Sequence, residues 1–188
     1  MLPRLGRIFA HIVVVIVVLS LAIPWHETAG HALTGVACGG TITEFRLFGF
    51  QFAPEVRWVG LAGGRGHCEV EGIGSEWCGH LTNFSGSTSS FAVALAAAFL
   101  LWRYKPDGLK RTALLSASFW AVDLLTAMLP SFGIRRYIWT GMSYSEPYQA
   151  AVGLGVPGPL FQFAALVGVA AVLLLVIAAM RAPEAGKA

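Results

Sequence analysis

Charged residues are scarce in this chain of 188 residues: Asp, Glu, Lys and Arg make up 12% of it, against about 25% in an ordinary soluble domain. Hydrophobic residues make up 56% even without the 22 glycines, which excludes both a water-soluble globule and a disordered chain. The net charge of +3 is too small and too scattered for a nucleic-acid-binding protein. The composition therefore predicts a small integral membrane protein.

Four apolar segments are each close to the ~20 residues that a helix needs to cross ~30 Å of hydrocarbon. They cover about residues 8–25, 82–102, 112–129 and 159–180. The first is interpreted as a retained helix and not a signal peptide, because no small-residue cleavage site follows it. The predicted fold is an all-α, multi-pass membrane protein with one domain, residues 1–188, and the lipid bilayer is its expected partner.

The charges between these segments predict how the helices are oriented. Eight of the thirteen cations lie at the N-terminus, between the second and third helices, and in the tail: Arg4, Arg7, Arg103, Lys105, Lys110, Arg111, Arg181 and Lys187. The long first loop, residues 39–79, instead contains five glutamates and only three arginines. Because cytoplasmic loops are enriched in Lys and Arg, we expect both termini to be cytoplasmic and the first loop to lie outside.

The first loop contains two stretches in which polar and apolar residues alternate, Thr41–Phe48 and Glu55–Val59. This is the period of half-buried strands, so we expect a small β-hairpin or sheet at the membrane surface. An edge of the Thr41–Phe48 strand is a candidate for binding an extended peptide by strand addition. Aromatic rings expected at the lipid–water interface are Phe48, Phe50, Phe52 and Trp58.

Two of the three cysteines, Cys68 and Cys78, fall in this predicted outer loop, where an oxidising compartment favours disulfides. We therefore predict a Cys68–Cys78 disulfide. The alternative is a second metal site formed by His67-Cys68 and Cys78-Gly-His80, although this spacing matches no zinc module. Cys38 is expected to be a small buried residue.

The densest group of ionisable residues, His26-Glu-Thr-Ala-Gly-His31, follows the first apolar helix. Zinc sites with an H-E-x-x-H motif place two histidines on one helical face, with the glutamate as general base. Here the histidines are five residues apart, and on a regular α-helix they would point about 140° apart. Two arrangements are open: a π-bulge realigns both histidines and leaves Glu27 as the base, or Glu27 and His31 are ligands and His26 is not.

This segment resembles the zinc motif of the site-2 protease family of intramembrane zinc metalloproteases, with one residue inserted. The likeness includes Gly-His-Ala-Leu, the Gly39-Gly40 turn, the strand-like residues after it, and a later helix that opens Cys78-Gly-His-Leu-Thr-Asn83. The spaced form His-Glu-x-x-Gly-His is similar to the zinc motif of dipeptidyl peptidase III. The resemblance implies a membrane-embedded zinc metalloprotease that hydrolyses peptide bonds of membrane proteins or peptides, in or near transmembrane segments.

Catalytic zinc requires a third protein ligand besides His26 and His31. The resemblance implies a carboxylate near the end of a later helix. Asp123 is the only carboxylate other than Glu27 inside a predicted span, and we favour it narrowly as the metal ligand. The alternative third ligand is Glu146, in Ser-Glu-Pro after the third helix.

Non-catalytic interpretations stand beside this one. Asp123 would then be a packing carboxylate paired with Arg135 or Arg136. The whole chain would be a small membrane subunit or assembly factor of a larger membrane complex that keeps a protease-like fold. A metal-binding or transport accessory that uses the same histidines is the third hypothesis.

Overall fold

The structure is a computed structural model and describes residues 4–60, 66–136 and 144–181. One continuous helix opens the chain and consists of α1 (Arg4–Trp25), the π-helix η1 (His26–Ala32) and α2 (Leu33–Ala37). After a small sheet come α3 (Glu76–Tyr104), α4 (Gly108–Ser118), α5 (Ala121–Met128), the 3₁₀-helix η3 (Leu129–Phe132), α6 (Glu146–Gly153) and α7 (Gly158–Arg181). The tail cation Lys187 lies outside the described residues.

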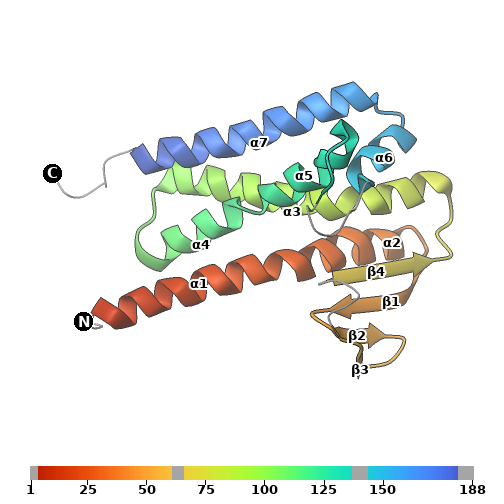
Figure 1. Cartoon of the computed structure of the whole chain (residues 1–188), viewed down its shortest axis with the longest axis horizontal. Coiled ribbons are helices and arrows are strands. Elements are labelled where there is room, and N and C mark those ends of the chain that lie inside the picture. Colours follow the sequence, from red (N-terminus) through yellow and green to blue (C-terminus); the bar gives the residue numbers. More distant parts are fainter. Residues whose placement is uncertain (1–3, 61–65, 137–143, 182–188) are drawn as a thin grey trace.

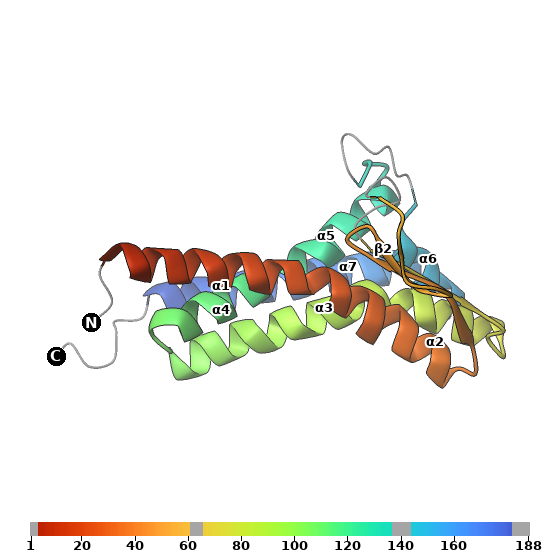
Figure 2. The same cartoon turned by 90° about the horizontal axis from the view of Figure 1, so that it is seen from below.

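Four helical segments are long and apolar enough to span a membrane, as the sequence predicted. They are Arg4–Ala37, Glu76–Tyr104, Gly108–Phe132 and Gly158–Arg181. All four lie side by side along the long axis of the molecule, and the start of α1 and the end of α7 lie at the same end of the bundle (Figure 1, Figure 2). The first segment extends well beyond the predicted residue 25, because the helix continues through η1 into α2.

Helix α3 lies at the centre of the bundle and packs against η1, α4, α5, α6 and α7. Its many Ser, Ala and Gly residues let neighbouring backbones approach closely, as is usual for helices that pack in membranes. Buried side chains from α3, α5, α6 and α7, together with Trp120 just before α5, make the core: Ala94, Ala98, Trp120, Ala121, Leu124, Met128, Ala151, Phe161, Ala165 and Val172. In contrast, α1 buries none of its side chains.

The third predicted span is two helices that meet at Phe119 and Trp120. At this break the indole N–H of Trp120 donates to the carbonyl oxygen of Val18 in α1 (3.1 Å). The indole thus ties the start of α5 to α1. Asp123 in the first turn of α5 is thereby held near the end of α1, where His26 begins the π-helix.

The loop between α2 and α3 forms an antiparallel sheet with strand order β3-β2-β1-β4. The strands are β1 (Thr41–Leu47), β2 (Phe50–Ala53), β3 (Arg57–Trp58) and β4 (Gly66–Glu71). The predicted small sheet is present. However, β1 is an inner strand, because it pairs with β4 over Thr41–Leu47 and with β2 over Phe45–Leu47, so Thr41–Phe48 is not the edge strand that was expected.

Cys78 forms its disulfide with Cys38, and Cys68 is a free thiol. The predicted Cys68–Cys78 pairing was therefore wrong, and the alternative metal site loses the thiolate of Cys78. The reason is the path of the chain: Cys38 follows α2 directly, and the backbone N–H of Gly74 donates to its carbonyl oxygen (3.2 Å) just before α3 begins. Cys68 instead lies in β4, where exposed and half-buried residues alternate, and its side chain is on the half-buried side of that strand.

Removal of this disulfide is expected to lower the free energy of unfolding by about 4 kcal/mol, because it closes a loop with a sequence separation of 40 residues. The measurement is denaturant unfolding of the Cys38→Ser/Cys78→Ser variant, with Cys68→Ser as the matched control. A reductant should destabilise the wild-type chain and the control equally and leave the double variant unchanged. Wild-type stability that is indifferent to reductant would contradict the prediction.

Candidate metal centre

The first helix changes from α to π geometry at the residues that the sequence singled out. In η1 the backbone N–H of Leu33 donates to the carbonyl oxygen of Thr28, five residues earlier. Two neighbours favour this local change: Pro24 has no N–H to donate, and the hydroxyl of Thr28 donates to the carbonyl oxygen of Pro24. The π geometry of the first arrangement is therefore present, as a seven-residue π-helix, and the role of Glu27 as the base stays a prediction.

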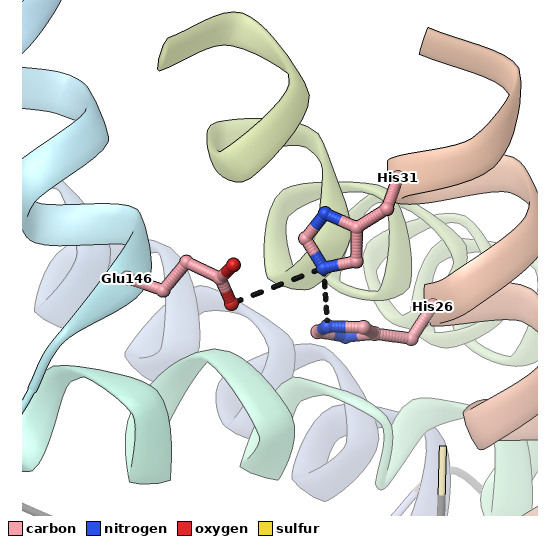
Figure 3. A group of neighbouring side chains, drawn as sticks. All are labelled: His26, His31 and Glu146. Carbon is pink, nitrogen blue, oxygen red and sulfur yellow. Dashed lines mark hydrogen bonds and ion pairs between the residues drawn. The ribbon is translucent and has the colours of Figure 1, made fainter. Parts of the chain in front are cut away.

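The π-helix turns both histidine rings to the same side (Figure 3). His31 donates from Nδ1 to the carbonyl oxygen of Thr82 in α3 (2.9 Å), since a carbonyl can only accept. His26 donates from Nδ1 to Oδ2 of Asp123 in α5 (2.7 Å). The two Nε2 atoms then face each other at 3.1 Å.

This geometry brings two nitrogen lone pairs together in a partly buried place. In neutral rings whose Nδ1 atoms are both donors, both Nε2 atoms are acceptors, so no hydrogen bond can form between them. A cation between the two nitrogens satisfies both. Two nitrogens bound to one tetrahedral zinc at ~2.0–2.1 Å lie roughly 3.3 Å apart, close to the observed 3.1 Å. The donor set therefore fits a metal ion.

The two carboxylates considered as third ligand lie on different sides of the histidine pair. Glu146, the first residue of α6, brings Oε2 to 3.8 Å from Nε2 of His31, and with both histidines it forms a group that could hold a metal (Figure 3). Asp123 instead occupies Nδ1 of His26, on the far edge of that ring. The geometry therefore favours Glu146 as the ligand, although the sequence had narrowly favoured Asp123.

Asp123 is placed to orient the ring of His26. Its second oxygen accepts from the guanidinium of Arg136 (3.0 Å), whose side chain is only 12% exposed. The pairing with Arg136 that the sequence offered as an alternative is present, together with the contact to His26. A carboxylate on the non-ligating nitrogen of a histidine holds the ring in one tautomer and orientation, as is common around metal sites.

Two glycines allow the helices to meet at this place. A Cβ on Gly30 of η1 would lie 2.5 Å from Cα of Gly86 in α3, so the backbones are in direct contact. A Cβ on Gly86 would lie 2.5 Å from Nε2 of His31 and 2.7 Å from Nε2 of His26. The missing side chain of Gly86 therefore makes room for both rings. Sequence reasoning missed Gly86, although a dense run of small residues in α3 was visible.

Glu27 is buried beside the histidines and lies against the sheet. A Cβ on Gly66, the first residue of β4, would lie 2.7 Å from Oε1 of Glu27. Its charge also acts on the next inward-facing residue of β4: burial, and then the carboxylate of Glu27, raise the pKa of the Cys68 thiol to about 11. The carboxylate of Glu27, the candidate general base, is thus positioned between η1 and the edge strand β4.

For a hydrolase that uses Glu27 as its base, the function proposed below, Gly66→Ala is expected to lower the rate of hydrolysis roughly a hundredfold, because the added methyl group displaces the carboxylate of Glu27 by about an ångström. Zinc content should not change, since no metal ligand contacts Gly66. Gly74→Ala is the matched control, because a Cβ there meets only one atom, at 3.6 Å. Equal hydrolysis by the two variants, measured at saturating zinc, would contradict the position inferred for Glu27.

A second group of metal-binding residue types lies on the sheet: Glu44, His67 and Glu69. Glu44 already forms an ion pair with Arg46 of the same strand. The glutamates Glu44 and Glu69 are directly opposite each other across β1 and β4, and His67 and Glu69 are exposed. With an arginine at its centre, this group is better explained as a solvated cross-strand cluster than as a metal site.

Comparisons of this chain with protein-family models, with curated proteins and with solved structures give no match.

Proposed function

We propose that this chain is a multi-pass membrane zinc hydrolase that cuts peptide bonds in or near membrane-spanning segments. The observation that carries the proposal is the partly buried pair of Nε2 atoms of His26 and His31, 3.1 Å apart and next to the carboxylate of Glu146. Two histidines and a glutamate are the protein ligands of a known class of catalytic zinc sites that leave one position open. The resemblance of His26–His31 to the site-2 protease motif supports the same chemistry.

Insertion in a membrane is part of the proposal. Four helical segments have the necessary length and hydropathy. Along α1 the exposed side chains are almost all apolar, and α1 has no buried residue, so lipid is the environment that its surface fits. The exposed rings of the sheet, Phe50, Phe52 and Trp58, suit the lipid–water interface.

Each side chain of the centre has one task in this mechanism. His26, His31 and Glu146 would hold the zinc, and Asp123 and the carbonyl of Thr82 fix the two rings. A zinc ion held there would supply the activation of a water molecule and the polarisation of the scissile carbonyl.

Glu27 is the proposed general base. In the net reaction one water is consumed: its oxygen joins the carbonyl carbon, the C–N bond breaks, and Glu27 carries the water's proton to the leaving nitrogen. The second proton of the water also ends on the released amine, so the products are an ammonium group and a carboxylate.

Metal content and hydrolysis of the purified full chain test this proposal. We expect about one zinc per chain, its loss in His31→Ala, and its retention in Glu27→Gln, which should no longer cleave a membrane-anchored peptide. Zinc-free wild-type protein in a stable complex with a larger partner would overturn the proposal and favour the membrane-subunit hypothesis. Zinc binding without Glu27-dependent cleavage would favour the metal-binding accessory.

A further inference from the structure

The basic residues and the disulfide lie at opposite ends of the helix bundle. The first residues of α1, the turn between α3 and α4, and the end of α7 are together at one end (Figure 1). The basic residues of that end are Arg4, Arg7, Arg103, Lys105, Lys110, Arg111 and Arg181, and the one acidic residue described there is Asp107. By the positive-inside rule this end faces the cytoplasm.

The Cys38–Cys78 disulfide gives an independent indication of the same orientation. It joins the end of α2 to the first turn of α3, at the end of the bundle that holds η1, the sheet and α6 (Figure 1). Disulfides persist in oxidising compartments and are rare in the cytosol. The end of the bundle that holds the metal centre is therefore the extracytoplasmic one.

The length of α1 gives the depth of the centre. Residues 8–25, the part of α1 beyond its two arginines, rise about 27 Å, close to the ~30 Å of hydrocarbon, so His26 lies in the outer part of that layer. Trp77 and Trp102, exposed near the two ends of α3, are separated by about 37 Å along the helix, as expected for the two aromatic belts of a membrane protein. Gly86, which meets both histidine rings, is about 14 Å along α3 from Trp77 and about 24 Å from Trp102, so the centre lies in the outer half of the membrane.

We propose that the metal centre opens at the outer surface of the membrane and cleaves the extracytoplasmic ends of membrane-anchored polypeptides. This inference rests on the proposed hydrolase function for its chemistry, and on charge, disulfide and depth for its side. The bond cleaved is then next to a membrane span, in a stretch of chain that water and the centre can both reach. It is neither at mid-membrane nor on the cytoplasmic side.

Single added cysteines test the orientation in intact cells that express the full chain. Val56→Cys reports the sheet end, where Val56 is 74% exposed, and Asp107→Cys reports the basic end. Native thiols interfere little, because Cys38 and Cys78 are paired and Cys68 has a raised pKa. A membrane-impermeant maleimide should label Val56→Cys before permeabilisation and Asp107→Cys only after it. The reverse pattern, or no labelling of Val56→Cys on intact cells, would overturn the proposal.

Two matched reporters test the substrate class in the same cells. Both carry one apolar membrane anchor and the same extended tail, which is extracytoplasmic in one reporter and cytoplasmic in the other. We expect cleavage beside the outer end of the anchor, mapped by mass spectrometry, and its loss with the Glu27→Gln chain. Cleavage of the cytoplasmic tail, or within the anchor, would overturn the proposal.

The outcomes separate this inference from the proposed function. If neither reporter is cut and the purified chain is free of zinc, the proposed hydrolase fails, while the maleimide pattern still reports which side the centre faces. If Glu27-dependent cleavage occurs only on the cytoplasmic side, the hydrolase stands and this inference fails.

Discussion

Gly86→Ala is expected to weaken zinc binding at the proposed metal centre strongly. The added Cβ would lie 2.5 Å from Nε2 of His31 and 2.7 Å from Nε2 of His26, far inside the ~3.5–4.0 Å of an ordinary contact, so both rings must move. Structural zinc sites bind with ~10–16 kcal/mol over four ligands, so displacement of one ligand costs about 3 kcal/mol. The expected loss in zinc affinity is therefore at least about a hundredfold.

Gly79→Ala is the matched control for this change. It lies on the same helix, α3, and a Cβ there meets no atom within 4 Å. Zinc affinity, measured by competition with a chelator, should fall in Gly86→Ala and stay at the wild-type value in Gly79→Ala. Because α3 is central to the bundle, helicity and thermal unfolding of both variants are measured as well. Wild-type zinc affinity in a folded Gly86→Ala chain would show that the metal is not held between His26 and His31.

Glu146→Gln and Asp123→Asn are expected to weaken zinc binding to different extents and in different ways. Glu146→Gln removes a negatively charged ligand, which should cost about 10²–10³-fold in affinity. Asp123→Asn keeps an oxygen that can accept from Nδ1 of His26 and loses only its charge, so about 10–100-fold is expected.

The visible spectrum of the Co²⁺-substituted chain distinguishes the two roles, because its bands report the number and type of ligands. Glu146→Gln should change these bands, and Asp123→Asn should leave them as they are in the wild type while the affinity falls. If the bands instead change only in Asp123→Asn, Asp123 is the ligand, as the sequence had favoured. Gln149, one turn further along α6, gives a matched control as Gln149→Ala, for which we expect neither change.

The residues of the centre that are close together in sequence could be predicted from it. His26, Glu27 and His31 were identified because ionisable groups at the end of an apolar helix are costly without a function. Their spacing left two arrangements open. The structure has the π geometry, which Pro24 and Thr28 favour locally. Hydrogen bonds from His26 to Asp123 and from His31 to Thr82, in other helices, stabilise it.

Partners that are distant in sequence could not be predicted in the same way. Local sequence patterns do not show which helix ends come together. Asp123 and Glu146 could therefore be named as candidate third ligands, but the sequence could not decide between them. The sequence analysis paired Cys78 with Cys68, which is nearer in sequence. In the structure its partner is Cys38, and the four strands of the sheet lie between these two cysteines in the chain. The role of Gly86 was invisible, because a glycine that makes room for two rings has no sequence pattern of its own.

The sequence by itself determined the membrane-type composition, the four apolar helices, the small sheet and the residues with the chemistry, since each depends on the composition or period of one short segment. Only the tertiary structure decided which of those residues meet. It brings Nε2 of His26 close to Nε2 of His31 and closes the Cys38–Cys78 disulfide. It also places Asp123 at Nδ1 of His26 and Glu146 near Nε2 of His31. The physical reason is that these contacts join helices far apart in sequence, and their geometry is set by how the backbones pack around α3.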